Sequence, residues 1–142
     1  MFKEYKRDQF TIYTDRKKVD TEAVCSFLSK SYWANTRNKD TILRSIENSL
    51  CFSLFKEDTQ VGFARLVTDY ATFAYLCDVY IDEDYRGSGL GKWLMKCIVD
   101  HDEIKDIKKT MLATSTAHGL YKKYGFDAIS NPELYMILAR QV

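Results

Sequence analysis

The chain has 142 residues, of which 21 are Lys or Arg and 20 are Asp or Glu, so its formal net charge is +1. Charges of both signs are mixed along the chain, which argues against a general nucleic-acid or membrane surface. No apolar run is long enough to span a bilayer, and the first residues are charged, unlike a secretion signal. We therefore expect a cytoplasmic protein with one domain, residues 1–142.

The four cysteines, Cys25, Cys51, Cys77 and Cys97, are widely spread and lie within apolar patterns. None of them forms a Cys-x-x-Cys pair, and neither histidine has a Cys at the spacing of zinc ligands. We expect reduced thiols in the core and no metal site.

The N-terminal half predicts one strand, two helices and then three strands. Residues 9–14 (QFTIYT) alternate between apolar and polar, which is typical of a strand. Asp20 or Thr21 is expected to cap a helix that runs to about Ser31, and Asp40 to cap a shorter second helix. Turns at 57–60 and 69–71 separate the strands predicted at 50–56, 61–68 and 72–81.

The C-terminal half continues with a helix over about 90–101, whose apolar residues recur at helical spacing. A strand is predicted at 110–114, and a short helix over 117–124 ends at Gly125, which suits a left-handed cap. The last strand or strands are expected at 126–129 and 134–139, with Pro132 in the loop between them. This order predicts an α/β fold with a mixed sheet and helices on both faces.

A glycine-rich loop, Arg86-Gly87-Ser88-Gly89-Leu90-Gly91, joins the strand at 72–81 to the following helix. The first N–H groups of a helix lack partners within it, and together with the helix dipole they favour a bound anion. Arg86 adds a formal positive charge. The loop therefore predicts a site for a phosphate group.

Spacing separates three kinds of phosphate-binding loop. The Walker A pattern fails because Arg86 stands five residues before Gly91 and Trp93 follows Lys92. The dinucleotide pattern fails because Lys92 occupies the third glycine position. The pattern R-x-x-G-x-G is met by Arg86, Gly89 and Gly91, and it resembles the pyrophosphate loop of the GNAT superfamily of N-acetyltransferases, which use acetyl-coenzyme A.

A second block, Leu120-Tyr121-Lys122-Lys123-Tyr124-Gly125-Phe126, resembles the L-Y-x-x-x-G-F segment of the same family. The order of the expected elements is also that of the GNAT fold, so the resemblance covers nearly the whole chain. It implies a central, mostly antiparallel sheet with helices on both faces. Thr116 departs from a related bacterial subgroup, which has Asp there, so a charge-dependent role of that position is not expected.

The resemblance implies a division of roles around acetyl-coenzyme A. The pantetheine arm would align with Val79, Tyr80 and Ile81, and the backbone N–H of Val79 would stabilise the oxyanion of a tetrahedral intermediate. Tyr121 would protonate the leaving thiolate, although the helix pattern alone favours a tyrosine packed on the core. The remaining expected cofactor contacts are Arg86, Gly87, Ser88, Gly89, Leu90, Gly91, Lys92 and His118. Three of these have a structural alternative: Ser88 as only a small loop residue, Lys92 as a solvated charge, and His118 as a histidine that caps a helix.

The attacking amine must be neutral, so a base or a chain of waters is needed. Asp78 is the first candidate because it interrupts an apolar strand just before Val79, and Asp69 and Glu47 are others. Equally, Asp78 suits a structural carboxylate held by hydrogen bonds. The resemblance also implies a strand bulge here, which would alter the face to which Asp78 points.

Acceptor recognition is expected from the first helix-loop-helix region and the central strands. The candidates are Tyr32, Trp33, Arg37, Arg65, Tyr70, Phe73 and Tyr75. The function that follows is direct acetyl transfer from acetyl-coenzyme A to the primary amine of a small molecule. A protein or peptide acceptor, and a non-catalytic coenzyme A sensor, stay open as alternatives, as does a homodimer.

Overall fold

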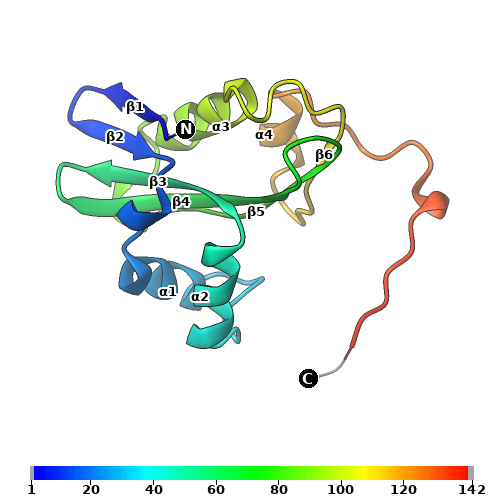
Figure 1. The fold of residues 1–142 in the computed structure, drawn as a ribbon, viewed down its shortest axis with the longest axis horizontal. Helices are drawn as coiled ribbons and strands as arrows, with labels where there is room; N and C mark the ends of the chain where they lie inside the picture. Colours follow the sequence, from blue (N-terminus) through cyan, green and yellow to red (C-terminus); the bar gives the residue numbers. More distant parts are fainter. Residues whose placement is uncertain (1, 141–142) are drawn as a thin grey trace.

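The computed structural model describes residues 2–140. Its centre is a six-stranded sheet in the order β1-β2-β3-β4-β5-β6 (Figure 1). The strands are β1 (Glu4–Arg7), β2 (Phe10–Tyr13), β3 (Leu50–Lys56), β4 (Thr59–Thr68), β5 (Ala74–Ile81) and β6 (Thr110–Met111). All neighbours are antiparallel except β5 and β6. The predicted mixed α/β sheet is therefore confirmed.

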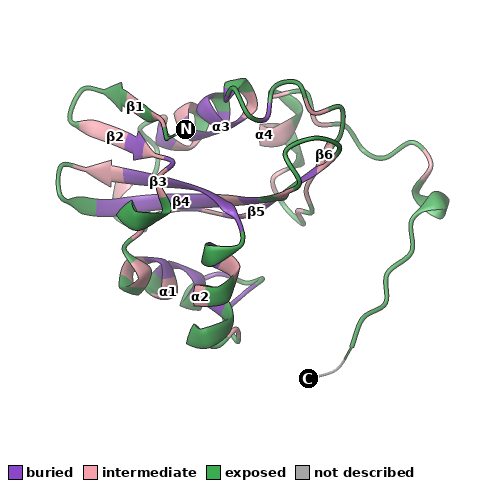
Figure 2. Cartoon of the chain, viewed as in Figure 1, coloured by how far each residue is buried: buried purple, intermediate pink, exposed green. Residues whose placement is uncertain are grey.

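Helices cover both faces of this sheet. Helices α1 (Thr21–Ser29) and α2 (Lys39–Glu47) lie on one face, and α3 (Leu90–Asp100) lies on the other, with the short α4 (His118–Lys122) beyond it (Figure 1). Each face buries its own apolar cluster. The α3 face is built around Ile12, Phe52, Leu66 and Leu94, and the other around Phe27, Ile46 and Phe63. Strands β3 and β4 in the middle of the sheet are mostly buried, whereas the edge strand β1 is mostly exposed (Figure 2).

Side-chain caps fix where α1 and α2 begin. The Asp20 carboxylate accepts the Ala23 N–H at 3.2 Å, so the first of the two predicted caps is confirmed. In α2 the capping residue is Asn38, whose side chain accepts the Thr41 N–H at 2.9 Å. The predicted cap Asp40 instead lies in the first turn, where a negative charge suits the helix dipole.

The register of β5 against β4 contains a bulge. Arg65 pairs with Cys77 and Phe63 with Tyr80, so Asp78 and Val79 together stand opposite the single residue Ala64. Asp78 takes a φ of 55°, a left-handed conformation that Asp tolerates better than most residues. The structure therefore contains the bulge that the sequence analysis expects here.

The two ends of the chain differ from the strands predicted from the sequence. The charged segment Glu4–Arg7 forms β1, an edge strand paired with β2, which is not among the predicted strands. At the other end, residues 126–129 and 134–139 form no strand, and Leu134 belongs to a 3-10 turn, Pro132–Leu134. Strand β6 is also shorter than predicted and ends at Met111. Within residues 2–140, no helix is long and apolar enough to cross a membrane.

Candidate active site

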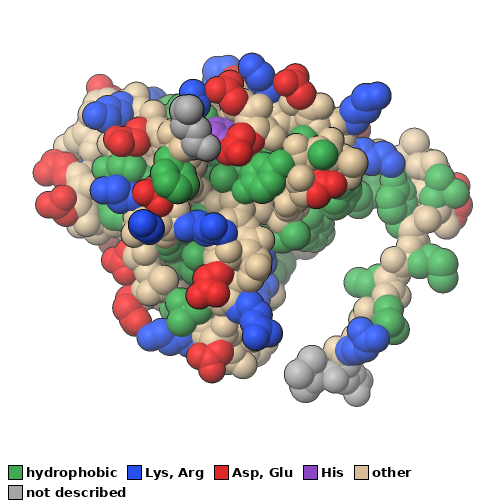
Figure 3. All heavy atoms as spheres, viewed as in Figure 1, with side chains coloured by type: hydrophobic (Ala, Val, Ile, Leu, Met, Phe, Trp, Pro, Cys, Tyr) green, Lys and Arg blue, Asp and Glu red, His purple; other side chains and the backbone are tan. Residues whose placement is uncertain are grey.

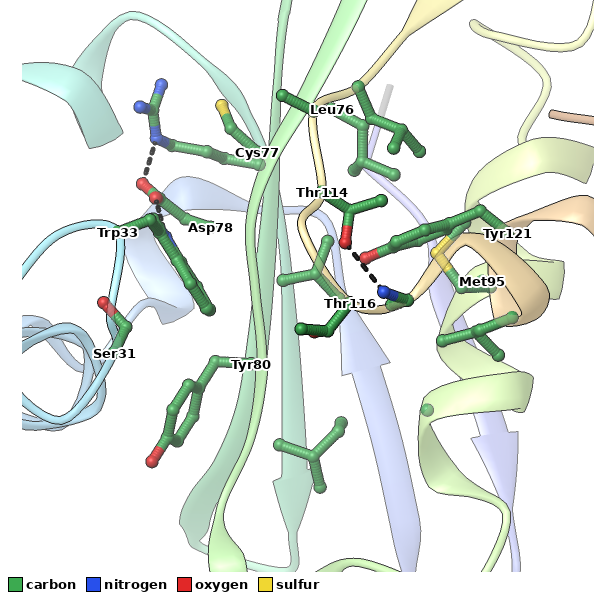
Figure 4. A pocket seen from close by; sticks show the side chains of 18 of the residues that line it. Ser31, Trp33, Leu76, Cys77, Asp78, Tyr80, Met95, Thr114, Thr116 and Tyr121 are labelled. Atoms are coloured by element: carbon green, nitrogen blue, oxygen red, sulfur yellow. Dashed lines mark hydrogen bonds and ion pairs between the residues drawn. The ribbon is translucent and has the colours of Figure 1, made fainter. Parts of the chain in front are cut away.

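A cleft of about 1030 Å³ opens where β5 and β6 part. The two parallel strands pair only through Ala74 with Thr110 and Tyr75 with Met111. Beyond that point the edge of β5 from Cys77 to Ile81 faces the cleft rather than a neighbouring strand. The opposite wall comes from the segment after β6 and from α4, which carries Tyr121 (Figure 4). An extended ligand arm can therefore add to β5 along this edge.

The glycine loop closes one end of the cleft at the start of α3. Gly89 is the N-terminal capping residue, with φ of 85°, and no side chain caps the helix. The first helical hydrogen bond there runs from the Trp93 N–H to the Gly89 carbonyl at 3.0 Å. The N–H groups of Leu90, Gly91 and Lys92 thus precede the helical ladder and suit an anion such as a phosphate.

Arg86 fastens this loop to the end of β5. Its Nε donates to the Ile81 carbonyl at 2.7 Å, and its guanidinium lies 4.9 Å from the centre of the Tyr80 ring. Ser88 donates its hydroxyl to the Tyr85 carbonyl at 3.1 Å and does not line the cleft. Arg86 therefore shapes the loop as well as adding charge to it.

Arg7, on β1, supplies a second cation that the sequence analysis missed. A β-carbon built on Gly89 would lie 3.9 Å from Arg7 Nη2, so the guanidinium stands beside the capping residue of α3. The same group lies 6.0 Å from the centre of the Trp93 ring. Only the pairing of β1 with β2, which no apolar pattern announces, brings Arg7 here.

Tyr121 lines the cleft from the side opposite Asp78, with β5 between them (Figure 4). Its ring packs edge-on against Phe126, with the centroids 6.0 Å apart. Burial, with a smaller contribution from Tyr32, raises the pKa of the Tyr121 phenol above its usual value. The hydroxyl is therefore protonated at neutral pH, as a proton donor must be.

Asp78 is buried and both of its oxygens are occupied. Oδ1 accepts the indole N–H of Trp33 at 2.9 Å, and Oδ2 accepts Arg37 Nη1 at 2.8 Å and Arg65 Nε at 2.7 Å. Burial opposes ionisation, but the Arg65 hydrogen bond and the charges of Arg65 and Arg37 outweigh it and lower the pKa of Asp78. Of the two alternatives for this carboxylate, the geometry favours the structural one over the base.

The loop after α1 forms a roof over the acceptor side of the cleft. The Tyr32 hydroxyl accepts the Ser115 N–H at 3.2 Å, which joins this loop to the segment before α4. Tyr32 also packs edge-on against Trp33, with the ring centroids 5.1 Å apart. Trp33 in turn donates to Asp78 on β5, so hydrogen bonds hold this loop to both walls of the cleft.

The structure brings most of the predicted site residues to this one cleft. Those that line it are Tyr32, Trp33, Arg37, Arg65, Tyr75, Asp78, Val79, Tyr80, Ile81, Arg86, Gly87, Gly89, Leu90, Gly91, Lys92 and Tyr121. Ser88, Tyr70 and Phe73 are not among its lining residues, and His118 lines a separate groove between α3, β6 and α4. Asp69 caps the turn before β5 through Ala71, Thr72 and Phe73, and Glu47 ends α2, so neither alternative base is in the cleft.

Several lining residues are not among the predicted site residues, including Lys30, Cys77, Met95 and Thr114. Burial raises the pKa of the Cys77 thiol to about 11, so it is not a thiolate at neutral pH and is unsuited to nucleophilic attack. Of the charged residues in the described part of the chain that line the cleft, five are basic and one, Asp78, is acidic. The excess positive charge suits a ligand that carries phosphate groups.

Residues 47–128 match a family model described as an acetyltransferase (GNAT) domain. The crystal structure of a GNAT-family protein of Xanthomonas campestris pv. campestris is 39% identical, with a TM-score of 0.87 over 94% of this chain and 93% of that one. A Gibberella zeae protein described as an acetyltransferase is 26% identical over 82% of this chain and 78% of its own length. A Clostridium acetobutylicum protein described as an acetyltransferase and solved with acetyl-CoA shares the fold at 18% identity, with a TM-score of 0.67 over 98% of this chain and 96% of that one.

Proposed function

Because this chain belongs to the GNAT family of acetyltransferases, we propose that it transfers an acetyl group from acetyl-coenzyme A to the primary amine of a small molecule. The observation that carries the proposal is the arrangement along one cleft. The uncapped start of α3, the free edge of β5 and the Tyr121 phenol follow one another there. They suit the pyrophosphate, the pantetheine arm and the thioester of acetyl-coenzyme A in that order.

Acetyl-coenzyme A supplies the activated acetyl group, and the residues of the chain position it. The N–H groups of Leu90, Gly91 and Lys92 would hold the pyrophosphate, with Arg7 adding charge. Val79 lies in the bulge, where it shares the position opposite Ala64 with Asp78. We assign its N–H the role of hydrogen-bond donor to the carbonyl oxygen of the thioester. Tyr121 is assigned the proton that the departing sulfur needs.

The surroundings of Asp78 support direct transfer with water as the proton acceptor. Its two oxygens already accept three hydrogen bonds and its pKa is lowered, so it is a poor base. We assign it a positioning role, in which it holds Trp33, Arg37 and Arg65 around the acceptor. Cys77 remains protonated, which argues against an acetylated enzyme intermediate.

Two features support a small acceptor over a peptide. The Tyr32–Ser115 hydrogen bond bridges the mouth of the cleft, so an extended chain would have to break it to pass through. Trp33 is fixed by Asp78 and presents a rigid aromatic wall. A compact amine fits beneath this roof without displacing it.

The test is release of free thiol from acetyl-coenzyme A with a panel of polyamines, amino sugars, amino acids and a short peptide. We expect turnover with a small amine, and Tyr121→Phe lowers kcat by about 100-fold or more while the affinity for coenzyme A is retained. The matched control is Tyr124→Phe, because Tyr124 does not line the cleft and its hydroxyl donates only to the backbone carbonyl of Lys92. Its kcat should stay within a few-fold of the parent protein.

The pH profile provides a second measurement of the same role. The rate should rise with pH as the acceptor amine loses its proton. Since the pKa of Tyr121 lies above its usual value, loss of its proton should not lower the rate below about pH 10. Thiol release only with the peptide would contradict a small acceptor. If none of the amines in the panel gave thiol release, the chain would be a coenzyme A-binding module without transferase activity.

A further inference from the structure

The acceptor side of the cleft carries more positive charge than the coenzyme needs. Basic and acidic side chains are interspersed over the face of the body in Figure 3, and the whole chain has a formal charge of +1. Two of the five basic residues that line the cleft lie at the glycine loop and the first turn of α3. The other three, Lys30, Arg37 and Arg65, come from β4 and from the chain that follows α1.

Arg37 and Arg65 share a single carboxylate. Asp78 Oδ2 accepts from both guanidinium groups, at 2.8 and 2.7 Å, and their side chains are only 25% and 12% exposed. Within residues 2–140, neither arginine pairs with another carboxylate, so one of the two positive charges has no counter-charge. A cation that is largely removed from water is costly without a partner, and an anion bound beside it removes that cost.

Both arginines keep N–H groups that the described chain does not use. Arg37 donates through Nη1 to Asp78, and Arg65 donates through Nε to Asp78 and through Nη1 to the Ser49 hydroxyl at 3.1 Å. The hydrogen bonds of residues 2–140 thus leave Nε and Nη2 of Arg37 and Nη2 of Arg65 available. Guanidinium N–H groups are strong donors to carboxylates and phosphates, and both arginines line the cleft.

These two arginines lie away from the glycine loop and close to the reacting end of the cofactor. Arg65 pairs with Cys77, which is four residues, about 13 Å, before Ile81 at the end of β5. Cys77 is also only two residues before Val79, the residue assigned to the thioester. The free guanidinium N–H groups therefore border the place of the acceptor rather than that of the pyrophosphate.

We propose that the acceptor is a primary amine that also carries an anionic group, a carboxylate or a phosphate, and that Arg37 and Arg65 bind this group. The inference rests on the proposed acetyl transfer, because the bound anion would hold the molecule whose amine attacks the thioester. Asp78 fixes both guanidinium groups but cancels only one of their charges, and the other remains for the acceptor. Polyamines, which are cations throughout, are repelled from this end of the cleft.

Matched acceptors test the anionic group on the parent protein, with release of free thiol from acetyl-coenzyme A as the readout. Alanine, phenylalanine and lysine are each compared with their amides, and phosphoethanolamine with ethanolamine, so that one member of each pair lacks the anionic group. We expect kcat/KM to be at least about tenfold higher for the anionic member. A preference confined to the amino acids identifies a carboxylate, and one confined to phosphoethanolamine identifies a phosphate. Equal kcat/KM within every pair, or a preference for the amides, would overturn the anion site and leave acetyl transfer intact.

Arg37→Gln tests the assignment of the arginines. It removes the charge that Asp78 does not cancel, so it should raise KM for the anionic acceptors about tenfold, act mainly on KM rather than kcat, and reduce the preference within each pair. Asp78 keeps Arg65 as its partner, so the fold should persist. The matched control is Arg44→Gln, because Arg44 is exposed on α2 and does not line the cleft. An unchanged KM in Arg37→Gln would contradict the proposal.

Calorimetry distinguishes failure of the anion site from failure of acetyl transfer. The protein saturated with coenzyme A is titrated with the same pairs, and the anionic members should bind at least about tenfold more tightly to the parent protein than to Arg37→Gln. Such binding without thiol release from any acceptor would refute the proposed transfer and retain the anion site. Equal binding of both members of every pair would refute the site whether or not the chain is a transferase.

Discussion

Asp78 connects three side chains that are distant in the sequence. Trp33 and Arg37 come from the loop before α2, and Arg65 comes from β4. Removing one member of a buried ion pair leaves the remaining charge without compensation, which costs about 3–5 kcal/mol. The stability of the acceptor side therefore depends on one carboxylate.

We predict that Asp78→Asn lowers the free energy of unfolding by about 3 kcal/mol, because Arg65 and Arg37 lose their counter-charge. Asn is a suitable replacement because it also tolerates the positive φ at this position. The control is Asp127→Asn, an exposed carboxylate, which should change stability by no more than about 0.5 kcal/mol. Urea unfolding measures both.

The same variant has a predictable pH dependence. The pKa of Asp78 is lower in the folded protein than in the unfolded chain, where it is about 3.9. The ionised carboxylate therefore makes its full contribution to the free energy of unfolding above that pH, and the contribution is lost as the pH falls further. The stability difference between the parent protein and Asp78→Asn should thus be constant from pH 7 to 5 and shrink below pH 4. A difference that grows in acid would show that burial, not the arginines, controls this carboxylate.

The sequence identifies Asp78 as a candidate but not its role. A carboxylate that interrupts an apolar strand is equally a base or a structural anchor until its partners are known. Those partners lie 13, 41 and 45 residues away, so only the fold brings them together. Tyr121 and the glycine loop were easier to predict because each belongs to a short, contiguous block.

At the scale of elements, β1 connects the edge of the sheet to the start of α3. Tyr5 on this strand shares a 2.6 Å hydrogen bond with Nδ1 of the buried His101, at the end of α3. Arg7, two residues later, stands beside Gly89 at the other end of that helix. Strand β1 therefore fixes α3 and adds charge to the phosphate loop.

We predict that Arg7→Gln weakens coenzyme A binding about tenfold, because one charge-assisted contact to a phosphate is lost. The loss should diminish at high salt, which screens exposed charges. Lys6→Gln is the matched control: the neighbouring residue of the strand projects to the opposite face. Isothermal titration at low and high salt measures the coenzyme A affinity of both variants. Equal affinities of the two variants would show that Arg7 does not contact the bound phosphate.

Elements with local signals were predicted well, and those held by distant partners were not. The capping residue Asp20 marks the start of α1, and the turns at 57–60 and 69–71 delimit the central strands. Strand β1 is composed mostly of charged residues and forms because β2 offers it an edge. The segment 134–139 has the composition of a strand but, within one chain, no strand beside it.

At the scale of the whole molecule, the cleft divides the sheet into two unequal parts. Only two residue pairs join β5 to β6, while β1 to β5 form a continuous antiparallel sheet. A ligand that adds to the free edge of β5 would connect both parts. Its binding should therefore stabilise the fold as a whole.

We predict that coenzyme A at 100 times its Kd raises the free energy of unfolding by about 2.7 kcal/mol, as expected for a ligand that binds only the folded state. Hydrogen exchange should slow at residues 77–81 as well as at the glycine loop. ADP, which has the pyrophosphate but no pantetheine arm, should protect the loop alone. Equal protection of 77–81 by both compounds would show that the arm does not follow β5.

The bulge in β5 has a consequence for how the sheet tolerates insertions and deletions. Ala74 and Leu76 face α3 before it, and Val79 and Ile81 face α3 after it, so β5 has one residue more than its pairing with β4 requires. Deleting Asp78 would leave one residue opposite Ala64 and keep every other side chain on its present face. The additional residue therefore places the Asp78 carboxylate among Trp33, Arg37 and Arg65 without changing the face of any other side chain of β5.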